Sequence, residues 1–163
     1  MEGLTLRAGV TKIQDTDAQK GIELATLTAY DIPALAVLSV VAYGEQPTME
    51  SLLDAGDQIR MIFEGAFGEL LDDSLIGAWL EGELVGAIFG VLDPPWEDAP
   101  REPYVLDLMV APEYRRNGIA SALISELAKR VQTWGYDSLT LNLDLKKMPE
   151  AFRVYSHLGF ERV

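Results

Sequence analysis

A turn that contains two arginines, an asparagine and a glycine precedes a segment of helical periodicity in "EYRRNGIASAL", residues 113–123. A glycine at the start of a helix lets the backbone approach a ligand, and the free amides of the first helical turn point outward at the positive end of the helix dipole. A pyrophosphate could be bound there. The alternative is an ordinary surface turn, because many helices begin with glycine and basic residues.

Other phosphate-binding and catalytic motifs do not match this chain. A P-loop needs a Gly-Lys-Ser/Thr run after a first glycine, and the dinucleotide fingerprint needs three spaced glycines, whereas this turn has Gly118 followed by Ala120. The chain has no cysteine, which excludes disulfides and thiolate catalysis, and its single histidine rules out a mixed His and Cys metal site. We therefore expect no metal.

Composition and charge limit the class of protein and its partners. The chain has 163 residues, of which 48% are apolar, so one domain with a hydrophobic core is expected. The formal net charge of −13 repels nucleic acid and favours cationic partners. The longest apolar stretch, residues 32–43, is shorter than the roughly 20 residues of a membrane-spanning helix. We expect no nucleic-acid partner, no membrane association and a cytoplasmic location.

Hydrophobic periodicity predicts the elements that must position this turn. In the first half we expect a short strand at 4–10, a strand at 22–28, a helix capped by Asp31 that ends before Gly44, one or two helices within 48–71, and a hairpin of strands 75–80 and 84–92. In the second half we expect a strand at 104–110, a helix from 119 that ends at Gly135, a strand at 138–143, a helix at 149–158 and a last strand from Phe160. Strands separated by helices favour a parallel pair in an otherwise antiparallel sheet, which is a mixed α/β class.

The pattern Arg115-x-x-Gly118-x-Ala120 resembles the signature Gln/Arg-x-x-Gly-x-Gly/Ala of the GNAT family of acetyl-CoA-dependent N-acetyltransferases. Residues 106–143 and 151–163 are similar to the strand and helix pattern that surrounds this signature, and residues 22–38 resemble the family's opening strand and first helix. The resemblance covers residues 21–163 as a single domain and leaves residues 1–20 as an N-terminal extension. It implies a mixed, mostly antiparallel sheet with one splayed parallel pair and helices on both faces.

The resemblance also implies a site for acetyl-CoA. In the family, backbone amides of the span that matches Arg115, Arg116, Asn117, Gly118, Ile119, Ala120 and Ser121 hold the pyrophosphate of coenzyme A. The strand that matches Leu108, Met109 and Val110 pairs with the pantetheine arm. Many members carry Asn where Met148 stands, so one hydrogen bond to that arm is expected to be missing.

The resemblance implies that Tyr155 is the tyrosine that protonates the sulfur of coenzyme A; a tyrosine packed into the core through its ring is the alternative. A lysine-like amine has a pKa of about 10.4, so a carboxylate or a water chain must take a proton from it. Asp107 is the candidate base, because strand alternation places it and Met109 opposite Leu106, Leu108 and Val110. A solvated or structural carboxylate is the alternative for Asp107.

The predicted function is transfer of acetyl to a primary amine by direct attack in a ternary complex, and the alternative is a non-catalytic acyl-CoA-binding module. The acceptor is expected to be a small-molecule amine or a basic peptide. Three loop carboxylates, Glu97, Asp98 and Glu102, could recruit it, and Trp96 could line its pocket. His157 is expected on the surface. Relatives continue through another strand beyond the position of Val163; residues 4–10 could cover that sheet edge, or a second copy could cover it in a homodimer.

Overall fold

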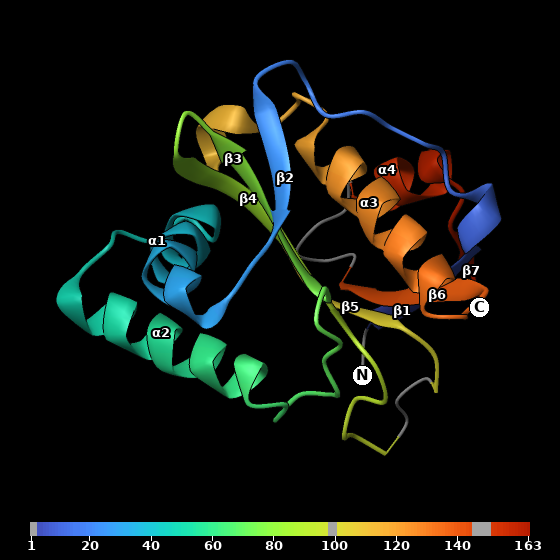
Figure 1. Cartoon of the computed structure of the whole chain (residues 1–163), viewed down its shortest axis with the longest axis horizontal. Coiled ribbons are helices and arrows are strands. Elements are labelled where there is room, and N and C mark those ends of the chain that lie inside the picture. The colour runs from blue at the N-terminus through green and yellow to red at the C-terminus, as the bar shows by residue number, and fades with distance from the viewer. Residues whose placement is uncertain (1–2, 98–100, 145–150) are drawn as a thin grey trace.

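Within the residues that the structure describes, a seven-stranded sheet forms the centre of the molecule and helices cover both of its faces (Figure 1). The computed structural model describes residues 3–97, 101–144 and 151–163, except for the side chain of Asp144. Helices α1 (Ile32–Ala42) and α2 (Met49–Phe63) pack on one face, and α3 (Ile119–Thr133) and α4 (Ala151–Leu158) pack on the other. This architecture confirms the predicted mixed α/β class.

The sheet is antiparallel except at one pair of strands. In order across the sheet, the strands are β2 (Ile22–Thr26), β3 (Leu75–Leu80), β4 (Glu83–Val91), β5 (Tyr104–Val110), β6 (Ser138–Asp144), β1 (Gly3–Gly9) and β7 (Glu161–Arg162). Only β5 and β6 run parallel among these neighbours. Short 3₁₀ helices lie at Val10–Lys12, Ala29–Asp31 and Pro112–Tyr114.

Helix α3 is held against the sheet by a row of apolar side chains. Leu123, Leu127 and Val131 repeat every four residues and are each fully buried. Two glycines of β4 make room for the helix: a Cβ added at Gly90 would lie 2.8 Å from a methyl carbon of Leu127, and Gly86 faces the start of α3 in the same way. The close approach fixes the N-terminal turn of α3 relative to β4 and β5.

The N-terminal strand closes the side of the sheet that we expected to be short. Strand β1 pairs with β6 over its whole length, from Gly3 opposite Asp144 to Gly9 opposite Ser138, and β7 pairs with β1. The predicted strand at 4–10 therefore exists, one residue earlier, and covers the edge of β6 within the same chain. The edge of β6, which a second copy was expected to cover in a homodimer, is therefore occupied by β1.

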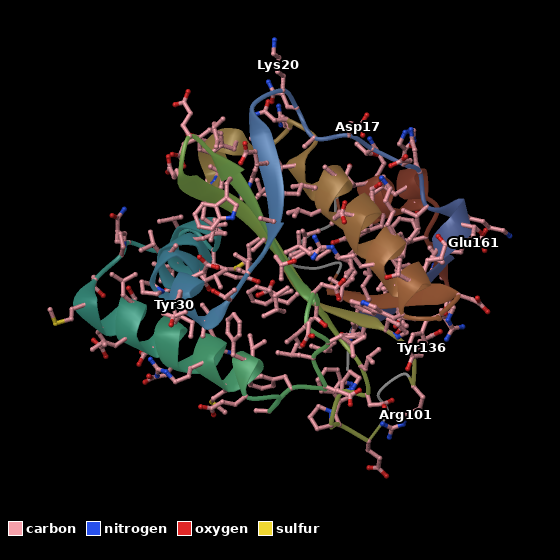
Figure 2. All side chains as sticks on the ribbon, in the orientation of Figure 1. Asp17, Lys20, Tyr30, Arg101, Tyr136 and Glu161 are labelled. Carbon is pink, nitrogen blue, oxygen red and sulfur yellow. The ribbon has the colours of Figure 1, made fainter. Side chains whose placement is uncertain are left out.

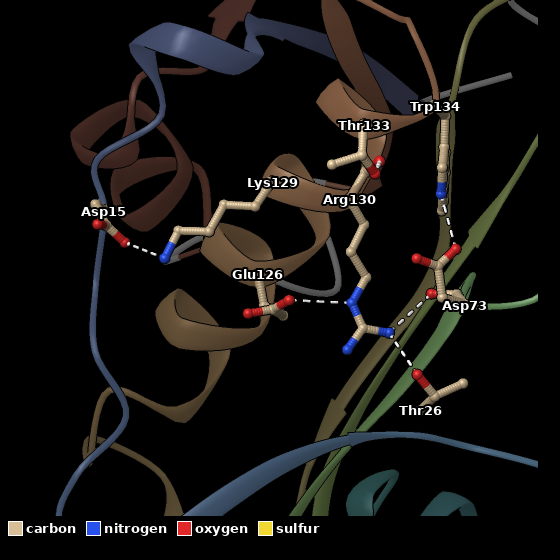
Figure 3. Close-up of polar contacts among 8 residues, drawn as sticks. All are labelled: Asp15, Thr26, Asp73, Glu126, Lys129, Arg130, Thr133 and Trp134. Atoms are coloured by element: carbon tan, nitrogen blue, oxygen red, sulfur yellow. Dashed lines mark hydrogen bonds and ion pairs between the residues drawn. The ribbon is translucent and has the colours of Figure 1, made fainter.

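Polar contacts attach α3 to the segments beside it (Figure 3). The ammonium of Lys129 lies 2.9 Å from the carboxylate of Asp15, on the segment that follows β1. Arg130 bonds the carboxylate of Glu126 at 3.0 Å and donates to the backbone carbonyl of Asp73 at 3.0 Å. These contacts join the helix to the N-terminal segment and to the residues before β3.

The helical pattern within 48–71 forms a single helix, α2, which is one of the two alternatives that the sequence allowed. One detail differs from the sequence-based expectation. Asp31 stands directly before α1, but its carboxylate does not cap that helix; it accepts a hydrogen bond of 2.8 Å from the backbone amide of Thr28. The prediction of an Asp31 cap for α1 is therefore wrong, because the preceding 3₁₀ turn uses the side chain first.

Charged side chains project from the loops at the periphery, as Lys20 and Arg101 do at opposite ends of the molecule (Figure 2). Among the helices of the described residues, none has both the length and the apolar composition required to cross a lipid bilayer.

Candidate active site

The two parallel strands separate at the centre of the sheet. Pairing between β5 and β6 is limited to Tyr104 opposite Thr140 and Val105 opposite Leu141. Beyond these pairs, residues 106–110 of β5 continue without β6 beside them, so backbone donors and acceptors along that edge are available to a ligand. This split is the feature that the family resemblance implies for the pantetheine arm.

A bulge in β5 accompanies the split. Phe89 of β4 lies opposite Asp107, whereas the next residue, Gly90, lies opposite Val105, so Leu106 is an additional residue in β5. Leu106 consequently packs against the α1–α2 core, on the same side as Met109. The prediction that strict alternation places Leu106 on the opposite face is wrong, because the bulge interrupts the two-residue period. Its placement of Leu108 and Val110 on the α3 side is correct.

The turn before α3 presents its backbone amides outward. Arg116 has φ +69° and Gly118 has φ +74°, so two left-handed residues bend the chain sharply. The first helical hydrogen bond runs from the amide of Ala122 to the carbonyl of Gly118, and no side chain of the described residues caps the preceding amides. A Cβ placed on Gly118 would meet nothing within 4 Å. The turn therefore has both the free donors and the open space that an anionic group requires.

The side chain of Arg115 contacts protein carbonyls. Its guanidinium donates to the carbonyl of Val110 at 3.2 Å and to the carbonyl of Ala42, at the end of α1, at 2.6 Å. Arg115 therefore ties the turn to β5 and to α1, while the side chains of Arg116 and Asn117 are exposed. The sequence did not predict this role, because Ala42 is 73 positions away.

A cleft of about 440 Å³ lies between α1, α2 and the sheet. Asp107 and Met109 line it, together with Tyr43, which follows α1 directly. The phenol of Tyr43 donates a hydrogen bond of 2.7 Å to Oδ1 of Asp107. Tyr43 is the site residue that the sequence analysis missed: nothing in its local sequence indicates a partner 64 positions away.

Burial and hydrogen bonds shift the pKa of Asp107 in opposite directions. Burial raises the pKa of its carboxyl group, while the hydrogen bonds from Tyr43 and from the backbone amide of Leu108 partly offset this increase. The net pKa of Asp107 is higher than that of an ordinary aspartate. A carboxylate with a raised pKa is a stronger base, which suits acceptance of a proton from an amine.

Tyr155, on α4, lies within the electrostatic range of Asp107. Burial raises the pKa of the Tyr155 hydroxyl to about 12, and the negative charge of Asp107 adds to the increase. The pKa of Tyr43 is also raised, first by burial and then by Asp107, and Tyr155 contributes to it as well. The Tyr155 ring packs edge-on against Phe160, with ring centroids 5.6 Å apart. The alternative considered for Tyr155, packing through its ring, is therefore observed, and the charge of Asp107 also acts on its hydroxyl.

The remaining candidates lie away from this cluster. Trp96 packs edge-on against Tyr104, with centroids 5.5 Å apart, and is absent from the lining of the cleft. Glu102 forms an ion pair of 2.6 Å with Arg7 of β1 and accepts a hydrogen bond from Ser138, so it holds its loop to the sheet. Glu97 and His157 are exposed. Asp98 and Met148 lie outside the described residues.

Metal-binding residue types do not gather in the described part of the chain: no three His, Cys, Asp or Glu side chains there are placed to share an ion.

Comparison with known proteins agrees with this geometry. Residues 44–160 match the model of the "Acetyltransferase (GNAT) family". No curated protein matches the chain in sequence. Among solved structures, a GCN5-related N-acetyltransferase from Sphaerobacter thermophilus has a TM-score of 0.70 and 19% identity, over 99% of this chain and 48% of that chain. This chain thus spans about half the length of that relative.

Two further structures are similar over most of their own length. The aminoglycoside antibiotic 6'-N-acetyltransferase AAC(6')-Ih from Acinetobacter baumannii has a TM-score of 0.65 and 14% identity, over 86% of this chain and 91% of that chain. The ribosomal-protein-S18-alanine N-acetyltransferase from Escherichia coli has a TM-score of 0.61 and 18% identity, over 85% of this chain and 76% of that chain. These likenesses concern the fold, while the family model matches the sequence itself across most of its length. The chain belongs to the GNAT acetyltransferase family.

Proposed function

We propose that this protein transfers an acetyl group from acetyl-CoA to a primary amine by direct attack in a ternary complex. The observation that carries the proposal is the hydrogen bond from the hydroxyl of Tyr43 to Asp107 beside the split between β5 and β6. Family membership supports acyl transfer. The three structurally similar proteins described above are N-acetyltransferases by name, which favours an amine as the acceptor.

The residues present fit coenzyme A. The amides of residues 116–121 at the start of α3 would hold its diphosphate, since no side chain of the described residues caps them and Gly118 leaves the space open. The free edge of β5 at Leu108, Met109 and Val110 would pair with the pantetheine arm. When bound, acetyl-CoA supplies an acetyl group activated as a thioester.

Each side chain of the cluster has a separate task in the proposal. Asp107 accepts a proton from the amine, and Tyr43 holds the carboxylate in place through its hydrogen bond. Tyr155 keeps its proton at neutral pH because its pKa is about 12, and it donates that proton toward the departing sulfur. A new N–C bond replaces the thioester C–S bond, so the products are an acetamide and a thiol.

Replacement of Tyr155 by Phe tests the proposal. We expect kcat for acetyl transfer, measured as thiol release over a panel of amines, to fall by about 10²–10⁴-fold in Tyr155→Phe. The dissociation constant for coenzyme A, measured by calorimetry, should stay within about twofold, because the phosphate-binding amides are untouched. Tyr136→Phe, on the loop after α3, is the matched control. Transfer that persists in Tyr155→Phe contradicts the general-acid role.

Cofactor binding is tested separately at the turn. Gly118→Trp is expected to abolish coenzyme A binding, because a bulky side chain at a left-handed position fills the space in front of the amides. Arg116→Ala should weaken binding only modestly, since backbone groups form most of the contacts. Coenzyme A binding without transfer to any amine would instead favour a non-catalytic acyl-CoA-binding module.

A further inference from the structure

The cleft beside Asp107 is acidic around its opening. Glu45 and Asp54 line it in addition to Asp107. Glu45 follows α1, where its backbone amide donates to the carbonyl of Val40 at 3.1 Å, and Asp54 lies on α2 across the cleft. Three carboxylates, one on α2, one on β5 and one on the segment between α1 and α2, thus line the same cavity.

No basic side chain of the described residues balances these carboxylates. The ion pairs in the described ranges involve other acids; on α2, for example, Arg60 pairs with Asp57 at 2.8 Å, outside the cleft lining. The nearby guanidinium of Arg115 donates to two backbone carbonyls. Among the described residues, no ion pair involves Glu45, Asp54 or Asp107, so these three carboxylates would favour a cationic ligand in the cleft.

The floor of the cleft is apolar. It is formed by buried side chains of α1, α2 and the sheet: Val40, Ile59, Ile62, Phe89 and Met109. A volume of about 440 Å³ falls within the range typical of small-molecule sites. The hydroxyl of Ser51 is engaged with Thr48 at the start of α2, so it adds little to recognition.

We propose that the acceptor is a small diamine whose two nitrogens are joined by an apolar chain. This inference rests on the proposed function. The neutral nitrogen that is acetylated lies at Asp107, the linking carbons lie on the apolar floor, and the second, charged nitrogen lies against Glu45 and Asp54. Acetylation turns one potential ammonium into a neutral amide, so the product carries one positive charge fewer and leaves the acidic cleft more easily.

A matched pair of probes tests the inference. 1,5-Diaminopentane and n-pentylamine share the same carbon chain and differ in the second charge. Their dissociation constants, measured by calorimetry in the presence of coenzyme A, and their kcat/KM values are compared. We expect the diamine to be preferred by about tenfold, a value typical of two partly exposed charge contacts. The preference should shrink as NaCl rises from about 50 mM to about 0.5 M, because salt screens exposed charges.

Three variants locate the source of the preference. Glu45→Gln and Asp54→Asn should each reduce the ratio of diamine to monoamine affinity by about threefold, and the double variant should bring it close to one. Asp57→Asn is the control on the same helix, since Asp57 lies outside the cleft lining. Folding of each variant is checked by its urea unfolding curve.

The outcomes separate this inference from the proposed function. Equal affinity for both probes, a preference that survives in the double variant, or tighter binding of a lysine-containing peptide than of the diamine would each overturn the diamine assignment. Acetylation of monoamines without any preference for the diamine defeats this inference alone. Preferential diamine binding without acetylation of any amine defeats the proposed function and leaves the ligand class standing.

Discussion

Replacement of Tyr43 by Phe removes one hydroxyl group and the hydrogen bond of 2.7 Å that it donates to Asp107. This hydrogen bond lowers the pKa of the Asp107 carboxyl group, so its loss raises that pKa further above the ordinary value. Hydrogen bonds to charged groups contribute about 1.5–3 kcal/mol. Because Tyr43 is 60% exposed, we reduce this to about 1 kcal/mol. A free energy of about 1 kcal/mol corresponds to an increase of about fivefold in the proton affinity of the Asp107 carboxylate.

The assay is the pH dependence of kcat/KM for one amine in the parent and in Tyr43→Phe. Asp107 acts as a base only when it is deprotonated, so a higher pKa moves the acidic limb of the profile toward higher pH. On that limb kcat/KM of the variant should be about three- to tenfold lower than that of the parent. At higher pH, where Asp107 is deprotonated in both proteins, the two values should converge. The titration of the amine itself cancels in the ratio of variant to parent.

Tyr30→Phe provides the control, because Tyr30 is 95% exposed on the surface (Figure 2). Its profile should coincide with that of the parent. A Tyr43→Phe enzyme that is slower by the same factor at every pH would refute the reasoning, since the hydroxyl would then not act through the ionisation of Asp107. Asp107→Asn should abolish the acidic limb altogether.

Four further predictions concern stability and are measured by urea unfolding. Gly159→Ala should cost about 3 kcal/mol, because φ is +116° and the new Cβ would lie 2.6 Å from the carbonyl oxygen of Lys12. Gly135→Ala, with φ +93° and nothing within 4 Å, should cost only about 1 kcal/mol. Arg115→Ala should reduce the free energy of unfolding by about 1–2 kcal/mol through loss of its two bonds to carbonyls. Hydrogen bonds from Lys129 and Ser125 lower the pKa of Asp15. Asp15→Asn should therefore be less stable than the parent near neutral pH, and this difference should vanish as the pH falls below about 4, where the carboxylate of the parent becomes protonated.

Much of the fold follows from short-range patterns. Strand β5 has the bounds that the sequence predicts, and α3 begins at Ile119 as its four-residue repeat indicates. The open turn before α3 was likewise predictable, since a glycine and unpaired first-turn amides belong to the helix start itself. The family signature could be identified for the same reason: its residues are close together in the sequence.

Contacts between distant segments could not be predicted in this way. The bulge at Leu106 depends on how β5 pairs with β4, and it overrides the alternation that the sequence suggests. From the sequence, Glu102 could either recruit the acceptor or belong to a solvated loop, but it forms an ion pair with Arg7, 95 positions away.

The sequence by itself determined the order and type of the elements and the open turn at Gly118, because periods of two and about four residues and the geometry of a helix start are local properties. The role proposed for Tyr155 comes from the family resemblance. Only the tertiary structure decided that β1 lies between β6 and β7, that Arg115 reaches the end of α1 and that Tyr43 binds Asp107. A periodic pattern indicates that one face of an element must be buried but carries no information about which distant element will bury it.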